Sequence, residues 1–158
     1  MKLNKYVIIL ISILIILIII ITTLLISIKN QSTFIEPKFE ENITTQMPEE
    51  INYKSQAINL SQNYSIYIDG VPKIENDNLI INFISLEDNN VWIKVRILNE
   101  KRQVVAESGL IKPGEYLKSV KTIENVVKND KLTYMIIGYE IDTYLSAGTV
   151  ELNIKVGD

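Results

Sequence analysis

The chain has 158 residues and a formal net charge of −3, and it contains neither histidine nor cysteine. Without histidine, the usual general base and the commonest metal ligand are missing. Without cysteine as well, Ser-His-Asp and Cys-His nucleophilic sites, ordinary zinc sites and disulfides are all excluded.

Residues 6–28 are an uninterrupted apolar stretch without a single charge. As a helix, this stretch would cover roughly 34 Å, slightly more than the apolar core of a bilayer, which is about 30 Å thick. It is longer than the apolar region of a cleaved signal peptide, and no small-x-small cleavage site follows it. The sequence therefore predicts one transmembrane helix that is retained as a signal anchor.

The charges on either side of this stretch predict its orientation. Lys2, Lys5 and the α-amine directly precede it, whereas Lys29 and an acidic segment follow it. By the positive-inside rule, residues 1–5 form a cytoplasmic tip and residues 29–158 are extracellular, which gives a single-pass protein of the cell membrane. The part after the stretch has 14 Lys and Arg against 19 Asp and Glu, a formal charge of −5. This balance argues against nucleic acid as a partner and against docking on anionic lipid.

Residues 29–55 show no sustained period in their apolar residues. The segment contains five glutamates and is interrupted by Pro37 and Pro48. Such a composition predicts a solvated, extended stalk. At full extension it could hold the following domain up to about 90 Å from the bilayer. The alternative is a peptide-like docking motif around Phe34, Ile35 and Phe39.

From residue 56 onward the apolar residues recur with a period of two, which is typical of half-buried β-strands. In residues 91–97, valine and isoleucine occupy the odd positions, while Trp92, Lys94 and Arg96 occupy the even ones. The other predicted strands are residues 65–68, 79–86, 104–106, 116–121, 132–139 and 151–156.

Turn-forming clusters separate these strands. They lie at residues 69–72, 75–78, 87–90, 99–102 and 112–115. The last cluster reads Lys-Pro-Gly-Glu, which predicts a type II turn with Pro113 second and Gly114 third. Strands at this spacing predict an all-β fold, an antiparallel β-sandwich of seven or eight strands in residues 56–158.

Three runs of residues carry a resemblance to a known group of proteins. They are residues 91–97 (VWIKVRI), 107–115 (ESGLIKPGE) and 146–153 (SAGTVELN). The chain resembles membrane-anchored surface proteins of clostridia and related Firmicutes, in which a span and a low-complexity stalk precede a β domain with an ESGLI-x-PG turn. The resemblance implies this topology and an envelope location, and it implies no catalytic residue. The chain departs from the group at residues 80–83, near which many members have Asn-Pro and a Cys. The bias of the chain toward Ile, Asn and Lys also favours a Gram-positive source with an AT-rich genome.

Aromatic residues are the strongest candidates for a binding surface. The predicted surface consists of Trp92, Tyr64, Tyr67, Tyr116, Tyr139 and Tyr144. Aromatic rings on a sheet face can stack on sugars or form a protein interface. The alternative is that Trp92 covers a sheet face beneath a loop, and that the tyrosines serve as β-formers with hydrated hydroxyls.

Paired carboxylates offer only a weak case for catalysis. Glu140 and Asp142 share a strand face by their spacing and could form the carboxylate pair of a glycosidase. A small sandwich without a cleft-forming insertion is a poor host for that reaction, so no catalytic residue is predicted.

Calcium is the one cofactor that the loops could hold. Glu75, Asp77 and Asn78, or Asp69 with Asp88, offer the oxygen ligands that Ca²⁺ prefers. The EF-hand spacing is absent, and loop Asp and Asn residues stabilise turns by themselves. No cofactor or metal site is therefore predicted.

The sequence predicts a non-enzymatic, membrane-anchored extracellular module of the cell envelope that binds a protein partner. The alternative is a carbohydrate-binding module for peptidoglycan or surface glycan, which would use Trp92 and nearby tyrosines. A third interpretation, an envelope enzyme, is disfavoured by the absence of histidine and cysteine.

Overall fold

The computed structural model describes residues 5–29, 34–49, 51, 57–60 and 64–157, with side chains of the N-terminal helix described up to Thr23. The chain divides into two compact units, Met1–Ile35 and Glu36–Asp158. Residues 1–4 of the predicted cytoplasmic tip, and residues 30–33, 50 and 52–55 of the predicted stalk, lie outside the described residues.

The first unit contains helix α1, Lys5–Lys29. Three hydroxyls bond within the helix: Ser12, Thr22 and Thr23 donate to the carbonyls of Ile9, Ile19 and Ile20 at 2.8, 2.9 and 2.8 Å. Hydrocarbon requires such internal bonding, because it offers no water to polar groups. In the part of the chain that the structure describes, α1 is the one helix long and apolar enough to cross a membrane.

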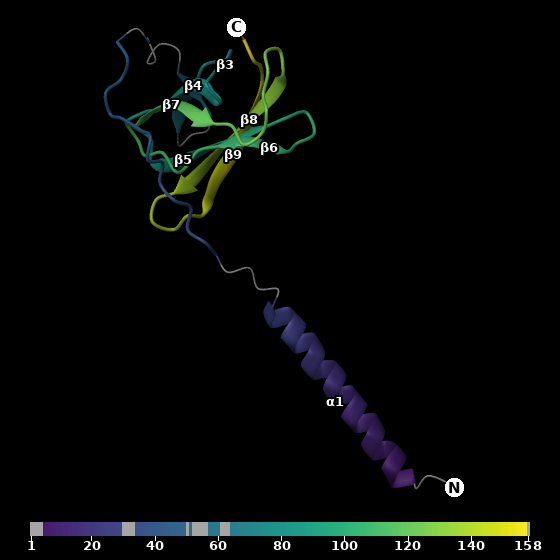
Figure 1. The fold of residues 1–158 in the computed structure, drawn as a ribbon. Coiled ribbons are helices and arrows are strands. Elements are labelled where there is room, and N and C mark those ends of the chain that lie inside the picture. Colours follow the sequence, from purple (N-terminus) through teal and green to yellow (C-terminus); the bar gives the residue numbers. More distant parts are fainter. Residues whose placement is uncertain (1–4, 30–33, 50, 52–56, 61–63, 158) are drawn as a thin grey trace. The chain divides into compact units, whose positions relative to one another are not determined.

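Nine strands are described in the second unit, and they form two antiparallel sheets (Figure 1). The strands are β1 (Ile58–Asn59), β2 (Ser65–Tyr67), β3 (Lys73–Glu75), β4 (Asn78–Ser85), β5 (Val91–Leu98), β6 (Val104–Glu107), β7 (Tyr116–Lys121), β8 (Lys131–Glu140) and β9 (Ser146–Lys155). The first sheet has the order β1-β2-β4-β3, with β7 also paired to β4. The second sheet has the order β6-β5-β8-β9.

The core lies between the inner faces of the two sheets. On β5 the odd-numbered residues Val91 to Ile97 are buried, and they pack with Leu132, Tyr134 and Ile136 of β8. Phe83 and Leu79 of β4 are buried in the same core. Each fully buried side chain of this size stabilises the fold by about 1.5–3 kcal/mol relative to exposure. The period-two pattern thus fixes which face of each strand is inside.

The predicted all-β sandwich is confirmed, with nine strands described against the seven or eight expected, and two of them outside the seven predicted ranges. The extra strands are β1 and β3, each too short to carry a periodic signal. The turn between β3 and β4 consists of Asn76 and Asp77, both with positive φ (48° and 62°). Two left-handed residues in sequence are the hallmark of a type I′ hairpin turn. The predicted turn at Pro113-Gly114 is also present, with φ of 77° at Gly114.

Residues 38–44, here named the strap, pair with the sandwich at two points. The Glu40 N–H donates to the Leu110 carbonyl at 2.9 Å, and the Leu110 N–H donates to the Lys38 carbonyl at 2.8 Å. Farther along, Thr44 and Tyr116 exchange two backbone hydrogen bonds of 3.1 and 2.8 Å. The strap is therefore fixed to the β domain by four main-chain hydrogen bonds.

The strap lies within residues 29–55, which the sequence analysis assigned to an extended stalk. In the structure the second compact unit begins at Glu36, twenty residues before the predicted domain boundary at residue 56. The physical reason is that Ile43 packs against the core, and that Phe39 contacts Trp92. Two isolated apolar residues among glutamates and prolines give no periodic pattern, although together with the four main-chain hydrogen bonds they hold the strap in place.

Candidate interaction surface

Trp92 lies on the outer face of the second sheet, where two aromatic rings contact it. The Phe39 ring of the strap meets the indole edge to face, with centroids 4.9 Å apart and planes at 82°. The Tyr144 ring lies 5.1 Å away at 51°. Such edge-on and tilted pairs are the favoured aromatic geometries. Trp92 is consequently half-buried rather than a fully open platform.

The loop between β8 and β9 exposes apolar side chains close to Tyr144 in the sequence. It carries Tyr144, and it leaves 40 % of Ile141 and 62 % of Leu145 exposed. The loop is closed by two backbone hydrogen bonds, from the Glu140 N–H to the Leu145 carbonyl at 2.8 Å and from the Tyr144 N–H to the Glu140 carbonyl at 3.1 Å. The apolar residues are thus presented on a tight, hydrogen-bonded turn.

Tyr139 completes the group, because it lies directly opposite Trp92 in the β5–β8 register. Directly opposed residues on an antiparallel pair share a face. We name this set of residues the hairpin-end patch. It consists of Phe39, Trp92, Tyr139, Ile141, Tyr144 and Leu145.

The position of Phe39 is determined by the segment that carries the ESGLIKPG sequence. The Gly109 N–H donates to a Glu40 carboxylate oxygen at 2.7 Å, directly beside the strap pairing at Leu110. The Lys112 ammonium lies 4.6 Å from the centroid of the Phe39 ring, a cation–π distance. The segment therefore binds the strap through a backbone donor, a cation and two main-chain hydrogen bonds.

Beside the patch, the outer face of the second sheet carries a compact ion cluster. Glu107 accepts from Lys94 and from Arg96, each at 2.5 Å. Burial opposes ionisation of Glu107, but the two hydrogen bonds and charges outweigh it and hold the pKa of Glu107 below its ordinary value. Glu107 offsets one of the two positive charges, and both cations are held by its carboxylate.

The other three predicted aromatic residues lie away from Trp92. Tyr64 is buried in the core with 3 % exposure, and its hydroxyl lies 3.5 Å from the Gly148 carbonyl. Tyr67 and Tyr116 belong to a hydrogen-bonded network on the first sheet. The structure therefore brings Trp92, Tyr139 and Tyr144 together and separates them from Tyr64, Tyr67 and Tyr116.

The network on the first sheet is centred on Asp69 and Asn82. Asp69 accepts from the Tyr67 hydroxyl at 2.8 Å and from the Asn82 amide at 2.6 Å, and the Tyr116 hydroxyl donates to Asn82 at 2.6 Å. Asn82 has a φ of 43° at a register shift in β4, which turns its side chain into the network. Burial, together with the neighbouring Asp69 carboxylate, raises the pKa of Tyr67 to about 12. The side chains of Tyr67, Asp69, Asn82 and Tyr116 are thus bonded to one another at a β-bulge.

The acidic residues considered for metal binding or hydrolysis belong to turns and hydrogen-bonded networks. Among the described residues, no three His, Cys, Asp or Glu side chains form a group that could hold a metal ion. Asp69 is bonded to Tyr67 and Asn82, as described above. Glu140 and Asp142 lie at the β8–β9 turn, where the Glu140 carboxylate accepts from the Thr143 hydroxyl at 3.0 Å.

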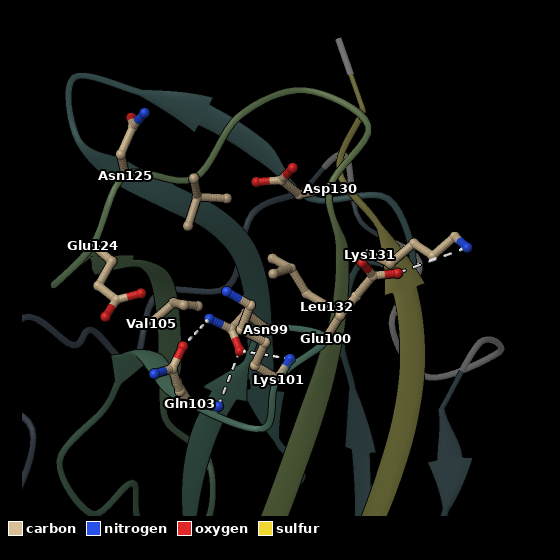
Figure 2. Close-up of a pocket in the computed structure, with 11 residues that line it drawn as sticks. Asn99, Glu100, Lys101, Gln103, Val105, Glu124, Asn125, Asp130, Lys131 and Leu132 are labelled. Atoms are coloured by element: carbon tan, nitrogen blue, oxygen red, sulfur yellow. Dashed lines mark hydrogen bonds and ion pairs between the residues drawn. The ribbon is translucent and has the colours of Figure 1, made fainter.

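A polar cleft of about 320 Å³ lies between the β5–β6 loop and the segment before β8 (Figure 2). Its floor contains Val105, Val126 and Leu132. Figure 2 shows the Asn99 amide bonded within its own loop, to the side chain of Gln103 and to the backbone of Lys101. The side-chain amide of Asn99 therefore orders the loop. The described residues that line the cleft include no aromatic ring on which a sugar could stack.

Sequence reasoning missed Ile141 and Leu145 as members of the surface, and it offered Phe39 only as part of a docking motif with Phe34 and Ile35. Ile141 and Leu145 flank Tyr144 in a segment where the two-residue period stops, and that interruption is the one available signal. The contact of Phe39 with Trp92 has no such signal, because it depends on a pairing with Leu110 that is distant in sequence.

The described side chains of the hairpin-end patch are apolar or aromatic, and those of Ile141 and Leu145 are exposed. A comparison with known protein families and with curated proteins finds no family model and no curated protein that matches this chain.

Proposed function

We propose that the protein is a membrane-anchored, extracellular interaction module that binds a protein partner through the hairpin-end patch. Helix α1 holds the module at the cell membrane, with the N-terminus in the cytoplasm. The observation that carries the proposal is the exposure of Leu145 and Ile141 on the same loop as an aromatic cluster. Aromatic anchors surrounded by smaller apolar side chains are typical of the central region of protein interfaces.

A protein partner is favoured over a glycan by the surroundings of Trp92. Phe39 and Tyr144 already contact the indole, so less of its ring is available to stack on a sugar. In addition, the most exposed members of the patch are aliphatic. Leu145 and Ile141 suit an apolar protein surface, whereas sugar recognition needs polar groups beside a flat ring.

The membrane part of the proposal is tested by fractionation of cells that produce the full chain. The protein should stay with the membranes after an alkaline wash, and external protease should degrade residues 36–158. Recovery of a shortened protein in the medium, or protection of the C-terminal part in intact cells, would refute the anchor or its orientation.

The binding part is tested with a photoreactive amino acid at Leu145 of the full chain in its native membrane. Irradiation should yield a specific protein adduct. Val71 and Ile123 are matched controls, because they are apolar and equally exposed (62 % and 70 %) but lie outside the patch. Equal adducts from all three positions would contradict the proposal, and binding to purified cell wall that is lost in Trp92→Ala would favour the glycan alternative.

A further inference from the structure

The strap sets how far the β domain can extend from the membrane. If residues 29–55 were all free, the domain could stand about 90 Å away. The strap instead is hydrogen-bonded to Leu110 and Tyr116 from Lys38 onward. Only residues 30–37 remain between the end of α1 at Lys29 and the first bonded residue of the strap.

We name these eight residues, 30–37, the leash. Their length gives an upper limit on the distance between Lys29 and Lys38, and this limit holds for any orientation of the domain. An extended chain spans at most about 3.6 Å per residue, so Lys38 lies within roughly 32 Å of Lys29. Phe39 is the next residue, and it belongs to the hairpin-end patch through its contact with Trp92. The patch therefore begins no more than about 36 Å from the end of the span, about two-fifths of the distance of roughly 90 Å expected from a free stalk.

The attachment of the strap, which shortens the leash, depends on particular residues of the ESGLIKPG segment. Gly109 leaves room for the backbone of Glu40, since a β carbon at Gly109 would lie 2.5 Å from the Glu40 nitrogen. The Glu40 carboxylate accepts from the Gly109 N–H, and Lys112 covers the Phe39 ring. Three separate interactions within the ESGLIKPG segment thus hold the end of the leash next to the patch.

We infer that the partner of the hairpin-end patch is a protein of the same membrane, bound through a part that lies close to the bilayer surface. This inference rests on the proposed function and adds the location of the partner to it. A partner held in the same membrane gains from a short leash, because the leash raises the effective concentration of the patch near the bilayer. A partner in the outer cell wall would instead require a long leash.

The length of the leash can be tested without a partner. Trp92 is the one tryptophan of the chain and lies in the patch, so its energy transfer to a labelled lipid headgroup in proteoliposomes reports the distance of the patch from the bilayer. Insertion of eight Gly and Ser residues after Ser32 doubles the leash and should lower the transfer. The same eight residues added at the C-terminus serve as the control. Equal transfer in the inserted protein and in wild type would overturn the inference that the leash sets the distance.

The location of the partner is tested by photocapture at Leu145 in the same two proteins. Effective concentration falls roughly as the −3/2 power of linker length, so doubling the leash should reduce capture about threefold. The captured protein should remain in the membrane fraction after an alkaline wash. An increase in capture with the longer leash, or capture of a wall protein, would overturn the inference while leaving the proposed function intact. No capture at either length would refute the proposed function itself, and the energy transfer would still report the leash separately.

Discussion

Gly109 lies so close to Glu40 that the two backbones leave no room for a side chain between them. Gly109→Ala should therefore lower the free energy of unfolding by about 1–3 kcal/mol, because the added methyl group must displace the strap or the segment before Leu110. Urea unfolding of the full chain in detergent, followed by Trp92 fluorescence, measures the effect. Gly70→Ala is the matched control, since a β carbon there meets no atom within 4 Å. Equal unfolding midpoints for the two variants would show that the strap is not held against Gly109.

The contact between Phe39 and Trp92 makes a second prediction. Phe39→Ala should shift the emission of Trp92 to longer wavelength, because one of the two rings that shield the indole is removed. An aromatic pair contributes about 0.5–1.5 kcal/mol beyond the area that it buries, so the free energy of unfolding should also fall. Ile35→Ala is the control, because Ile35 is 84 % exposed. An unchanged emission spectrum in Phe39→Ala would mean that the strap does not cover the indole.

The strands were predictable wherever one face of a sheet is buried. In β5 the alternation of valine and isoleucine with Trp92, Lys94 and Arg96 follows directly from the pleat, since successive side chains point to opposite faces. The type II turn at Gly114 was predictable for a similar reason, because its positive φ favours glycine. These features depend on residues that are adjacent in sequence.

The patch and the strap were not predictable in the same way. Phe39 reaches Trp92 only because Leu110 pairs with the strap, and Gly109 matters only because Glu40 approaches it. Neither relation leaves a local pattern. The sequence indicated Trp92, Tyr139 and Tyr144 as aromatic candidates together with Tyr64, but the inner or outer position of each tyrosine depends on the register of its strand. One such register places Tyr64 in the core.

The ion cluster at Glu107 predicts a loss of stability in acid. The pKa of Glu107 is lowered in the folded state, so its contribution is present above the unfolded value of 4.5 and is lost as the pH falls through the folded value. Glu107→Gln should lower the free energy of unfolding at pH 7 by about 1–3 kcal/mol, because Lys94 and Arg96 lose a charged acceptor. The variant should also show a weaker decline below pH 4.5 than wild type.

Glu100→Gln is the control for this prediction. The Glu100 carboxylate lies 3.7 Å from the Lys131 ammonium, and both side chains are largely exposed (69 % and 75 %). An exposed pair of this kind contributes about 0–1 kcal/mol, so its removal should leave the acid profile nearly unchanged. If Glu107→Gln and Glu100→Gln give the same profile in urea titrations between pH 3 and pH 7, the cluster at Glu107 adds nothing to stability.

The network around Asp69 predicts a loss of stability in alkali. Burial and the hydrogen bond to Asp69 raise the pKa of Tyr67 from 10.0 to about 12. Above pH 10 the unfolded chain releases the Tyr67 proton while the folded protein keeps it, so the free energy of unfolding falls as the pH rises toward 12. Tyr67→Phe should remove this part of the decline, and at neutral pH it should lower the free energy of unfolding by about 1 kcal/mol because Asp69 loses a donor.

Tyr116, whose pKa is also raised by burial and by Asp69, should keep a remaining part of the alkaline decline in the variant. The measurement is urea unfolding from pH 8 to pH 12, with Tyr139→Phe as the control, since Tyr139 lies outside the network. A slope in Tyr67→Phe as steep as in wild type would show that the folded protein does not hold the Tyr67 proton, and that the Tyr67–Asp69 hydrogen bond contributes little to the fold.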